Sequence, residues 1–291
     1  MISRKSHQYI AWVLILPVVA IRGFTTIYPI IRTFFNSFFD IRVLRGINKF
    51  TGISNYFNIF KDEKVITTLQ FTGMFVLFSM VLHVILGVVL AVILNMNFKG
   101  RRFLRTIVLI PWAMPAVVIG MAAKWAFNND YGLVNDFLRW FLPGFQMNWL
   151  INTETARAAV IAMDLWKDLP FFGILVLSGL QFISGDIYEA SRVDGASGFQ
   201  SFLYITLPLI MKNVLTLCIP FTLWRLTTFD LVYSMTSGGP GEDTSLIAYR
   251  ITMEAFTNLN VGYASALAVL LFLVMAVFSF MNLKFMQRYE D

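Results

Sequence analysis

The chain has 291 residues, of which 57% are hydrophobic and only 14% are charged, and its mean hydropathy is +0.68. Soluble domains carry about 25% charged residues, so this composition excludes an ordinary soluble protein and indicates a membrane protein that crosses the bilayer several times. The net charge of +6 fits basic cytoplasmic loops better than nucleic-acid binding, because no basic stripe with interleaved aromatic residues is present.

Six apolar segments are long enough to cross a bilayer, which takes about 20 residues of helix. They lie at about 10–35, 66–96, 104–126, 156–183, 208–235 and 261–285. Spanning segments in lipid are helices or closed barrels, and the apolar runs are continuous rather than alternating, which favours helices. We therefore predict an all-α membrane protein with six transmembrane helices in one domain, residues 1–291.

The first segment follows Arg4 and Lys5 and lacks a small-x-small cleavage motif, so we expect a retained membrane helix rather than a signal peptide. After the second segment, "NFKGRRFLR" (97–105) packs four basic residues into a short connection, which is a strong cytoplasmic signal. With six helices, this orientation places both termini and residues 184–207 in the cytoplasm. The outer loops then lie at about 36–65, 127–155 and 236–260, where we expect interfacial caps with short helical turns.

The single cysteine, Cys218, excludes an intrachain disulfide and a cysteine metal cluster. His83 stands alone in the second apolar segment, where we expect a packed or helix-bonded histidine. No metal site is predicted.

The fourth segment carries ionisable residues at membrane depth, where they are costly and are candidates for function. Asp164 and Asp168 are four residues apart on one helix face, and Lys167 is spaced to pair with Asp164. One interpretation is the lining of a transport pathway, in which the carboxylates accept hydrogen bonds from a substrate and Trp166 stacks on a ring of that substrate. The other is a self-neutralised group that holds helices together.

The connection 184–207 is the most polar and turn-rich internal stretch. Ser184 or Asp186 is suited to cap a short helix, Gly195 to end it at positive φ, and Pro208 to begin the next membrane helix. The pattern predicts a helix–turn–helix along the inner membrane surface. It is either a docking element for a cytosolic partner or an ordinary loop that turns the chain.

The fifth segment offers a second set of polar and aromatic pathway candidates. These are Trp224, Arg225, Thr228, Asp230 and Tyr233. Arg225 lies deeper than Asp230, and it either contacts a substrate or pairs with an acidic residue of a partner subunit. The segment is followed by the glycine-rich stretch "SGGPGEDT" (237–244), an external turn without the lysine that a phosphate-binding loop requires.

The connection also resembles a known motif. Membrane subunits of ATP-binding-cassette (ABC) importers carry Glu-Ala-Ala, three residues, Gly, nine residues and Ile-x-Leu-Pro. This chain has Glu189-Ala190-Ser191, then Gly195, then Ile205-Thr206-Leu207-Pro208 at the same spacing, and departs only at Ser191. "IYPIIRTFFNSFFD" and "FDLVYSMTSGGPGEDT" extend the resemblance, which covers the whole length, to the maltose-type permease family of carbohydrate importers. The resemblance implies the type I ABC importer permease fold.

The resemblance also implies partners and roles. A second, similar but distinct permease completes the pathway for a carbohydrate that an extracytoplasmic sugar-binding protein delivers. Two cytosolic ATPase subunits bind ATP and Mg, and no nucleotide motif occurs in this chain. We therefore expect a subunit that is not an enzyme and needs no cofactor of its own, in a prokaryotic cytoplasmic (inner) membrane.

Residue roles carry over by position in the motif. Glu189 pairs with a basic residue of the ATPase and Gly195 permits the bend, while Arg192 and Asp194 either add contacts or solvate the outer face. The remaining motif positions are Ala190, Ser191, Ile205, Leu207 and Pro208. The family places "SGGPGEDT" near the extracytoplasmic face, so Gly238, Gly239 and Pro240 are candidates for contact with the binding protein.

Other functions remain open from the sequence. Importers of amino acids, phosphate or metals share the loop motif, so a non-sugar solute is the first alternative. A stand-alone secondary transporter is a second, and it is disfavoured by the lack of an internal repeat. An intramembrane enzyme is a third, for which Asp164 and Asp168 are the only indication.

Overall fold

The computed structural model describes residues 4–287, with side chains from 12 to 286, and divides into two compact units. Unit 1 comprises the described residues up to Asp62 together with Ile251–Phe272. Unit 2 comprises Glu63–Arg250 and the described residues from Leu273 onward. The prediction of a single membrane domain over 1–291 stays a prediction.

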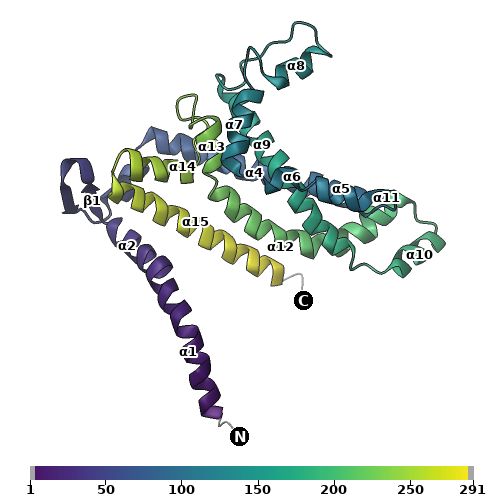
Figure 1. Ribbon diagram of the computed structural model, residues 1–291, viewed down its shortest axis with the longest axis horizontal. Coiled ribbons are helices and arrows are strands. Elements are labelled where there is room, and N and C mark those ends of the chain that lie inside the picture. The colour runs from purple at the N-terminus through teal and green to yellow at the C-terminus, as the bar shows by residue number, and fades with distance from the viewer. Residues whose placement is uncertain (1–3, 288–291) are drawn as a thin grey trace. The chain divides into compact units, whose positions relative to one another are not determined.

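Unit 1 is built from a long helix, a small hairpin and the helical segments that pack on it. Its elements are α1 (Arg4–Arg22), the π-helix η1 (Gly23–Ile27), α2 (Tyr28–Asn36), β1 (Phe39–Arg42), the 3-10 helix η2 (Val43–Arg45), β2 (Ile47–Phe50), α3 (Ser54–Ile59), the π-helix η4 (Met253–Thr257) and the first part of α15 (Val261–Gln287). The run from α1 through α2 is one continuous helix (Figure 1), which corresponds to the first predicted membrane segment.

Residues 36–65, which were predicted to form the first outer loop with short helical turns, contain a two-stranded antiparallel sheet. Phe39 pairs with Phe50 at its open end, and Gly46 turns the chain at φ +61°. The amide of Asn55 donates to the carbonyl oxygens of Ser37 and Phe39, both at 2.9 Å, and so holds α3 against the hairpin. The sheet is a small addition to an otherwise helical chain.

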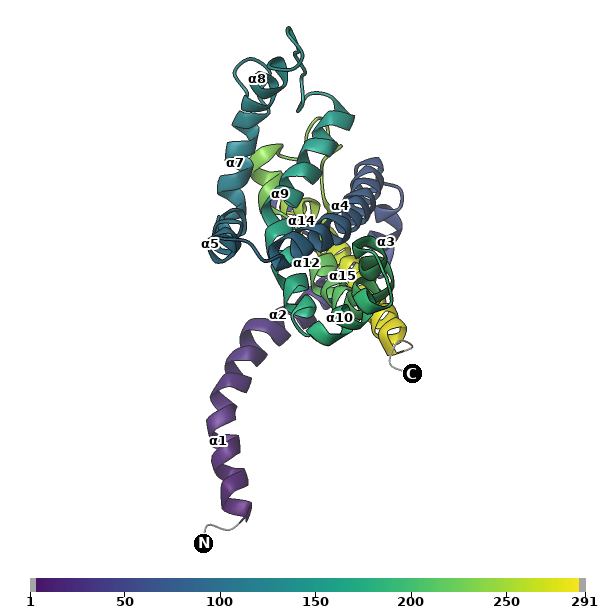
Figure 2. The ribbon, with the colours of Figure 1, turned by 90° about the vertical axis from the view of Figure 1, so that its right-hand side faces the viewer.

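Unit 2 contains the candidate site. Its elements are α4 (Glu63–Asn95), α5 (Arg101–Ile107), α6 (Ile110–Ala113), α7 (Ala116–Ala126), α8 (Leu133–Arg139), α9 (Thr153–Leu180), α10 (Gly185–Val193), α11 (Gly198–Ser201), the π-helix η3 (Phe202–Thr206), α12 (Leu207–Leu226), α13 (Asp230–Met235), most of α14 (Ile247–Thr252) and the end of α15. Helices α4 and α9 pack along each other and α12 packs against both, as Figures 1 and 2 show.

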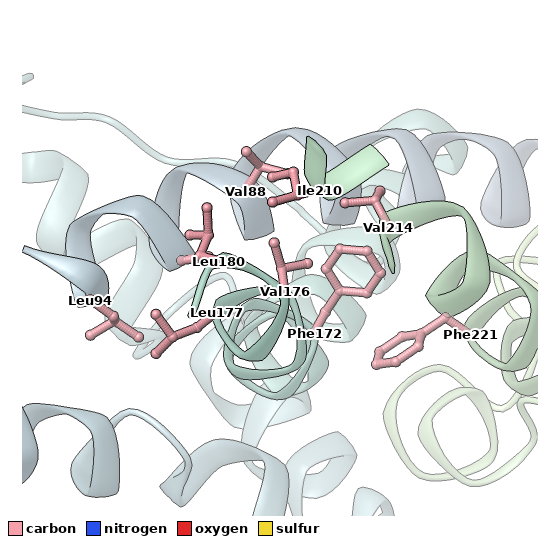
Figure 3. Close-up of a cluster of buried hydrophobic side chains, with 10 residues drawn as sticks. Val88, Leu94, Phe172, Val176, Leu177, Leu180, Ile210, Val214 and Phe221 are labelled. Atoms are coloured by element: carbon pink, nitrogen blue, oxygen red, sulfur yellow. The ribbon is translucent and has the colours of Figure 1, made fainter. Parts of the chain in front are cut away.

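The core of unit 2 lies between these three helices (Figure 3). Its buried residues are Val88, Ala91 and Leu94 of α4, Phe172, Val176, Leu177 and Leu180 of α9, and Ile210, Val214 and Phe221 of α12. Gly173 permits the close approach of α9 to α4, because a Cβ there would lie 2.8 Å from Leu90 Cδ2. Small residues serve this purpose at helix interfaces in membranes, where packing replaces the hydrophobic driving force.

The third predicted segment, at about 104–126, is not one straight helix. The stretch Arg101–Ala113 and the helix Ala116–Ala126 meet at 88°. Met114 takes an extended ψ of 140° immediately before Pro115. A residue before proline is driven out of the helical region, and proline has no N–H to continue the helix. The prediction of an unbroken helix was wrong.

The fifth predicted segment, at about 208–235, is also interrupted. Helix α12 ends at Leu226, and the separate short helix α13 begins at Asp230. On its other side the helix extends backward without a break, so that Gly198–Leu226 is one long helical stretch of 29 residues. The connection 184–207 therefore runs directly into a membrane helix.

Among the described residues, four helices are long and apolar enough to cross a membrane. They are Trp12–Asn36, Glu63–Asn95, Gly198–Leu226 and Val261–Met286, and the bent pair α5–α7 makes a fifth if it is one span. Helix α9 is outside this set, although its 28 residues are long enough, and it holds Asp164, Lys167 and Asp168 in its interior. These helices account for all six predicted segments.

Candidate functional site

Arg225 is the centre of a buried group of polar side chains that joins three helices. Only 1% of its surface is exposed. Its Nε lies 3.3 Å from Asp164 Oδ2, and its Nη2 lies 3.2 Å from Asp168 Oδ2. Because Arg225 is on α12 and both carboxylates are on α9, these ion pairs fasten the two helices together.

This geometry corrects the expected pairing of Lys167 and gives Arg225 partners that the sequence did not indicate. Arg225 pairs with two acidic residues of its own chain. Lys167 Nζ lies 2.7 Å from Asp168 Oδ1, so Lys167 pairs with its neighbour and not with Asp164. Asp164 is instead held by Arg225, as the interpretation of a self-neutralised group requires.

Helix α4 contributes Ser79 and His83 to the same group, which we call the charge cluster (Ser79, His83, Asp164, Asp168 and Arg225). The Ser79 hydroxyl donates to Asp164 Oδ2, and Arg225 Nη2 lies 2.9 Å from His83 Nε2. Arginine only donates hydrogen bonds, so Nε2 accepts and the ring proton sits on Nδ1, which lies 2.7 Å from the Ser79 carbonyl oxygen. The expectation of a helix-bonded histidine is confirmed.

A pocket of about 400 Å³ opens beside the charge cluster. Its lining residues are Trp112, Ala116, Asp164, Lys167, Asp168, Trp224, Thr227, Thr228, Phe229, Asp230 and Leu231. Six of the nine predicted pathway residues are therefore brought together from α9, α12 and the start of α13. The other three are absent from the lining: Arg225 lies buried behind it, Trp166 is exposed elsewhere, and Tyr233 stacks on Phe229 at 5.1 Å between ring centroids.

An aromatic ladder forms one wall of this pocket. The ring of Trp112 stacks on Phe171 at a centroid distance of 4.1 Å and an angle of 13°, and Phe171 in turn stacks with Trp224 at 6.3 Å and 26°. Both indoles are partly exposed. Flat aromatic faces beside hydroxyl-accepting carboxylates form a surface suited to a sugar ring.

The coupling segment, residues 184–207, has the helix–turn–helix form that the sequence predicted. The Ser184 hydroxyl accepts from the Asp186 N–H and so caps α10. Gly195 ends the turn after α10 at φ +80°, a conformation that favours glycine because it has no Cβ. Pro208 stands in the first turn of α12. The predictions for all three positions are confirmed.

A network of hydroxyl groups fixes α10 to the start of the α12 stretch. Ser191, the one departure from the motif, is buried, and its Oγ lies 3.0 Å from Ser201 Oγ. The Tyr188 hydroxyl lies 3.0 Å from Thr206 Oγ1, which donates to the Ser201 carbonyl oxygen. The two arms of the segment are thus joined by hydrogen bonds between α10 and the start of the helical stretch that continues into α12.

The charged residues Glu189, Arg192 and Asp194 of the coupling segment are all exposed. Arg192 Nε donates to the Tyr188 carbonyl oxygen at 3.2 Å, so this side chain stays beside the network. Behind the segment, a cavity of about 410 Å³ separates it from the ends of α4 and α9, with Asn95 and Leu180 among its lining residues. The face that carries Glu189 is therefore available to a partner.

The glycine-rich stretch 237–244 is held in a compact fold by hydrogen bonds and packing, and it is not an open loop. Gly238 is buried at φ +82°, where an added Cβ would lie 2.9 Å from the Tyr249 ring. The Tyr249 hydroxyl donates to the Ser237 carbonyl oxygen at 2.8 Å, and the Thr244 hydroxyl donates to that of Gly239 at 2.7 Å. Burial, and then the nearby Glu242 carboxylate, raise the pKa of Tyr249 above its usual value, so its hydroxyl stays protonated as a donor at neutral pH.

Comparison with known protein families agrees with the motif in residues 189–208. Residues 83–291 match the family described as "Binding-protein-dependent transport system inner membrane component". The chain belongs to this family. As a binding-protein-dependent permease component, it is a multi-pass membrane protein and part of a transport system, which agrees with the expectation of a subunit that is not itself an enzyme.

Curated relatives cover nearly the whole chain. The sulfoquinovosyl glycerol transport system permease protein SmoG of Agrobacterium fabrum is 34% identical over 91% of this chain and 86% of its own length. The trehalose/maltose transport system permease protein MalF of Thermococcus litoralis is 35% identical over 94% and 92%. The multiple sugar-binding transport system permease protein MsmF of Streptococcus mutans is 28% identical over 99% of both chains.

Solved structures show the same fold. A bacterial ABC transporter "involved in the import of the acidic polysaccharide alginate" contains a chain with a TM-score of 0.82 and 20% identity, over 98% of this chain and 97% of that one. A second structure of such a transporter, in complex with an alginate-bound periplasmic protein, gives a TM-score of 0.79 and 22% identity over 95% and 93%. The expected ABC importer permease fold is confirmed.

Sequence reasoning missed several residues of the site. Ser79 and His83 are four residues apart in an apolar helix, which signals one polar face, but their partners Asp164 and Arg225 lie 85 and 142 residues away along the chain. Trp112 and Thr227 gave no signal among the many aromatic and hydroxyl side chains. Their place in the pocket depends on the break after Ala113 and the helix end at Leu226.

Proposed function

We propose that this chain is one of two permease subunits of an ATP-driven sugar importer, and that residues 184–207 couple it to a cytosolic ATPase. The observation that carries the proposal is the coupling segment itself. It presents the exposed Glu189 on α10. Hydrogen bonds between hydroxyl groups of α10 and those of α11 and η3 join α10 to a membrane helix that ends beside the charged pocket. A push on α10 is therefore transmitted to the pathway through α12.

Sugar is the substrate class that the neighbouring proteins and the pocket both support. The relatives named above carry sugars or sugar glycosides in their descriptions. The pocket combines partly exposed indoles with carboxylates, which suits rings that carry many hydroxyl groups. Asp164, Asp168 and Trp224 are the pathway residues that we assign to this half of the importer.

The remaining parts of the importer are supplied by other chains. A second, distinct permease completes the pathway, an ATPase dimer binds ATP and Mg, and an extracytoplasmic binding protein delivers the sugar. A solved structure of similar fold is described in complex with such a periplasmic protein. Both termini and the coupling segment face the cytoplasm, in keeping with the four basic residues between 97 and 105.

Contact with the binding protein is assigned to the stretch around Gly238, Gly239 and Pro240. The compact fold of this stretch makes Gly238→Ala a poor test, because the new Cβ would strain the backbone and press on Tyr249. Ser237 is exposed and lies at φ +52°, which aspartate and asparagine tolerate better than bulky residues do. Ser237→Asp should lower the stimulation of ATPase activity by the binding protein, and unchanged stimulation would remove this assignment.

The decisive experiment measures coupling in the assembled importer reconstituted in liposomes with its binding protein. Glu189→Lys should reduce ATP-dependent sugar uptake at least about tenfold, since a hydrogen bond to a charged group contributes about 1.5–3 kcal/mol, while the melting temperature stays unchanged. Gly195→Pro should also reduce uptake, with some loss of stability, because proline cannot adopt φ +80° and cannot donate the hydrogen bond from Gly195 N to the Arg192 carbonyl oxygen. Asp130→Lys, at an exposed carboxylate of the external loop, is the matched control and should transport normally.

Alternative functions predict different results in the same system. Normal uptake by both the Glu189 and the Gly195 variant would refute the coupling role. Uptake by this chain alone, without ATPase subunits, would establish a secondary transporter. If the importer takes up amino acids or phosphate with ATP but takes up no sugar, the chain is still an importer subunit and the proposed substrate class is wrong.

A further inference from the structure

The charged groups in the wall of the pocket do not balance. Three carboxylates, those of Asp164, Asp168 and Asp230, face the pocket together with one ammonium group, that of Lys167. Arg225 lies behind this wall with 1% of its surface exposed and supplies a second positive charge. One negative charge is left over when every group is ionised.

The ion pairs assign the excess charge to one residue. Lys167 is bound to Asp168 at 2.7 Å, and Arg225 lies 3.3 Å from Asp164. Asp230 makes no side-chain hydrogen bond or ion pair within residues 12–286, and it is exposed. Its carboxylate is therefore the unpaired charge of the pocket.

The surroundings strengthen the field of this charge. The pocket has tryptophan and phenylalanine side chains in its wall and apolar helices behind it. Clefts with low-dielectric walls focus the field of one sign of charge and change the local concentration of charged ligands. Among the described residues of the lining, the single cation, Lys167, is already paired, so nothing in the wall offers an anion a free partner.

We infer that this half of the pathway favours neutral saccharides over anionic ones, and that Asp230 sets this preference. The inference rests on the proposed function, because it assumes that the pocket belongs to the sugar pathway. The relatives do not decide the matter, because sulfoquinovosyl glycerol carries an anionic sulfonate, whereas trehalose and maltose are neutral. Neutral sugars lose nothing to the unpaired carboxylate and gain an acceptor for their hydroxyl groups.

A purely structural role for Asp230 is the competing explanation. The residue stands in the first turn of α13, where a carboxylate stabilises the helix dipole. That role predicts that neutralising Asp230 lowers stability without altering the potential in the pocket. The two roles are therefore separated by a measurement of that potential.

The test uses a thiol reporter in the assembled importer in lipid nanodiscs. Cys218 is the only cysteine, so Cys218→Ala with Thr227→Cys places one thiol in the pocket lining. Cationic and anionic methanethiosulfonate reagents of equal size are compared by their rates of modification. We expect the cationic reagent to be favoured about tenfold relative to its preference for a free thiol in solution.

Asp230→Asn should remove most of this preference, and Asp230→Lys should reverse it. Asp130→Asn changes the charge equally but lies outside the lining, and it should leave the ratio intact. In a second arm, glucose at high concentration should protect the thiol better than glucuronate, and Asp230→Lys should reverse that order.

A ratio equal to that of a free thiol, or one that survives Asp230→Asn, would overturn the inference. So would failure of both reagents to reach the thiol. A lower melting temperature of Asp230→Asn with an unchanged ratio would establish the structural role instead. Failure of the proposed function has a separate signature, because it would appear as loss of ATP-dependent sugar uptake in the unmodified importer, whatever the ratio.

Discussion

The charge cluster and the coupling segment are two polar regions of unit 2 that are organised in opposite ways. In the charge cluster the ionised groups are buried, and Arg225 is surrounded by partners from two other helices. In the coupling segment the ionised groups, such as Glu189, are exposed, and the buried polar atoms are hydroxyls, such as those of Ser191 and Ser201.

The two arrangements suit different roles: the charge cluster holds helices of this chain together, whereas the coupling segment leaves its charges available to a partner. Burying a charge is expensive unless it is paired and hydrogen-bonded, so the cluster is closed upon itself and has nothing to gain from a partner chain. Neutral hydroxyl bonds can hold the coupling segment in shape while its charges stay solvated and free. We therefore expect variants of the cluster to damage stability first, and variants of the exposed face to damage coupling alone.

Removing Arg225 should produce the largest loss of stability. Arg225→Met leaves the buried carboxylate of Asp164 without its ion pair, and breaking a buried ion pair typically costs about 3–5 kcal/mol. We expect a marked fall in the melting temperature of the purified importer. Size-exclusion chromatography with fluorescence detection, after heating to a series of temperatures, measures it. Arg192→Met, at an exposed arginine of the coupling segment, is the matched control and should melt like the unmodified protein.

The same position allows a test of the cause. If unpaired charge is responsible, Arg225→Met combined with Asp164→Asn should recover part of the lost stability, although each change alone is harmful. If the double variant instead loses as much stability as the two single variants together, that result would show that lost packing, and not lost pairing, destabilises the protein.

Asp164→Asn alone should have the next largest effect. The amide keeps the shape of the side chain but removes the charge that Nε of Arg225 faces at 3.3 Å, leaving Asp168 to balance both Arg225 and Lys167. Hydrogen bonds to charged groups contribute about 1.5–3 kcal/mol, and we expect a loss in that range. Asp168→Asn is a useful comparison because its side chain is 16% exposed against 6% for Asp164, and it should cost less.

The coupling segment was largely predictable from sequence because its structure is local. Ser184, Gly195 and Pro208 determine a cap, a positive φ and a helix start through groups within a few residues of themselves. The apolar segments were predictable for a similar reason, since length and composition alone decide whether a helix can span a bilayer.

The charge cluster was only half predictable because its partners are distant in sequence. Spacing favoured a pair between Asp164 and Lys167, but Arg225 from α12 takes Asp164, and Lys167 turns to Asp168. No local rule could choose between these arrangements. The bend at Met114 was different, because "PWAMP" contained the necessary signal in its two prolines.

The hydroxyl network should respond weakly but measurably. Ser191→Ala removes the partner of Ser201 Oγ at 3.0 Å, and a neutral hydrogen bond contributes about 1 kcal/mol. We expect a loss of that size in the stability of the importer, with ATPase binding retained. A double-mutant cycle with Ser201→Ala isolates the bond: the second change should cost clearly less in the Ser191→Ala background, and full additivity would show that the two hydroxyls act independently.

Glu189→Gln should have the smallest effect on stability and is the sharpest test of the contrast between the two regions. The side chain is exposed on α10 and no partner within the described side chains holds it, so the melting temperature should not change. The consequence should appear only when the ATPase is present, as fewer sugar molecules transported per ATP hydrolysed, because the amide cannot pair with a cationic residue as a carboxylate does. A lower melting temperature of the permease without its ATPase would mean that Glu189 belongs to the internal framework of the segment, and the division between closed cluster and open face would fail.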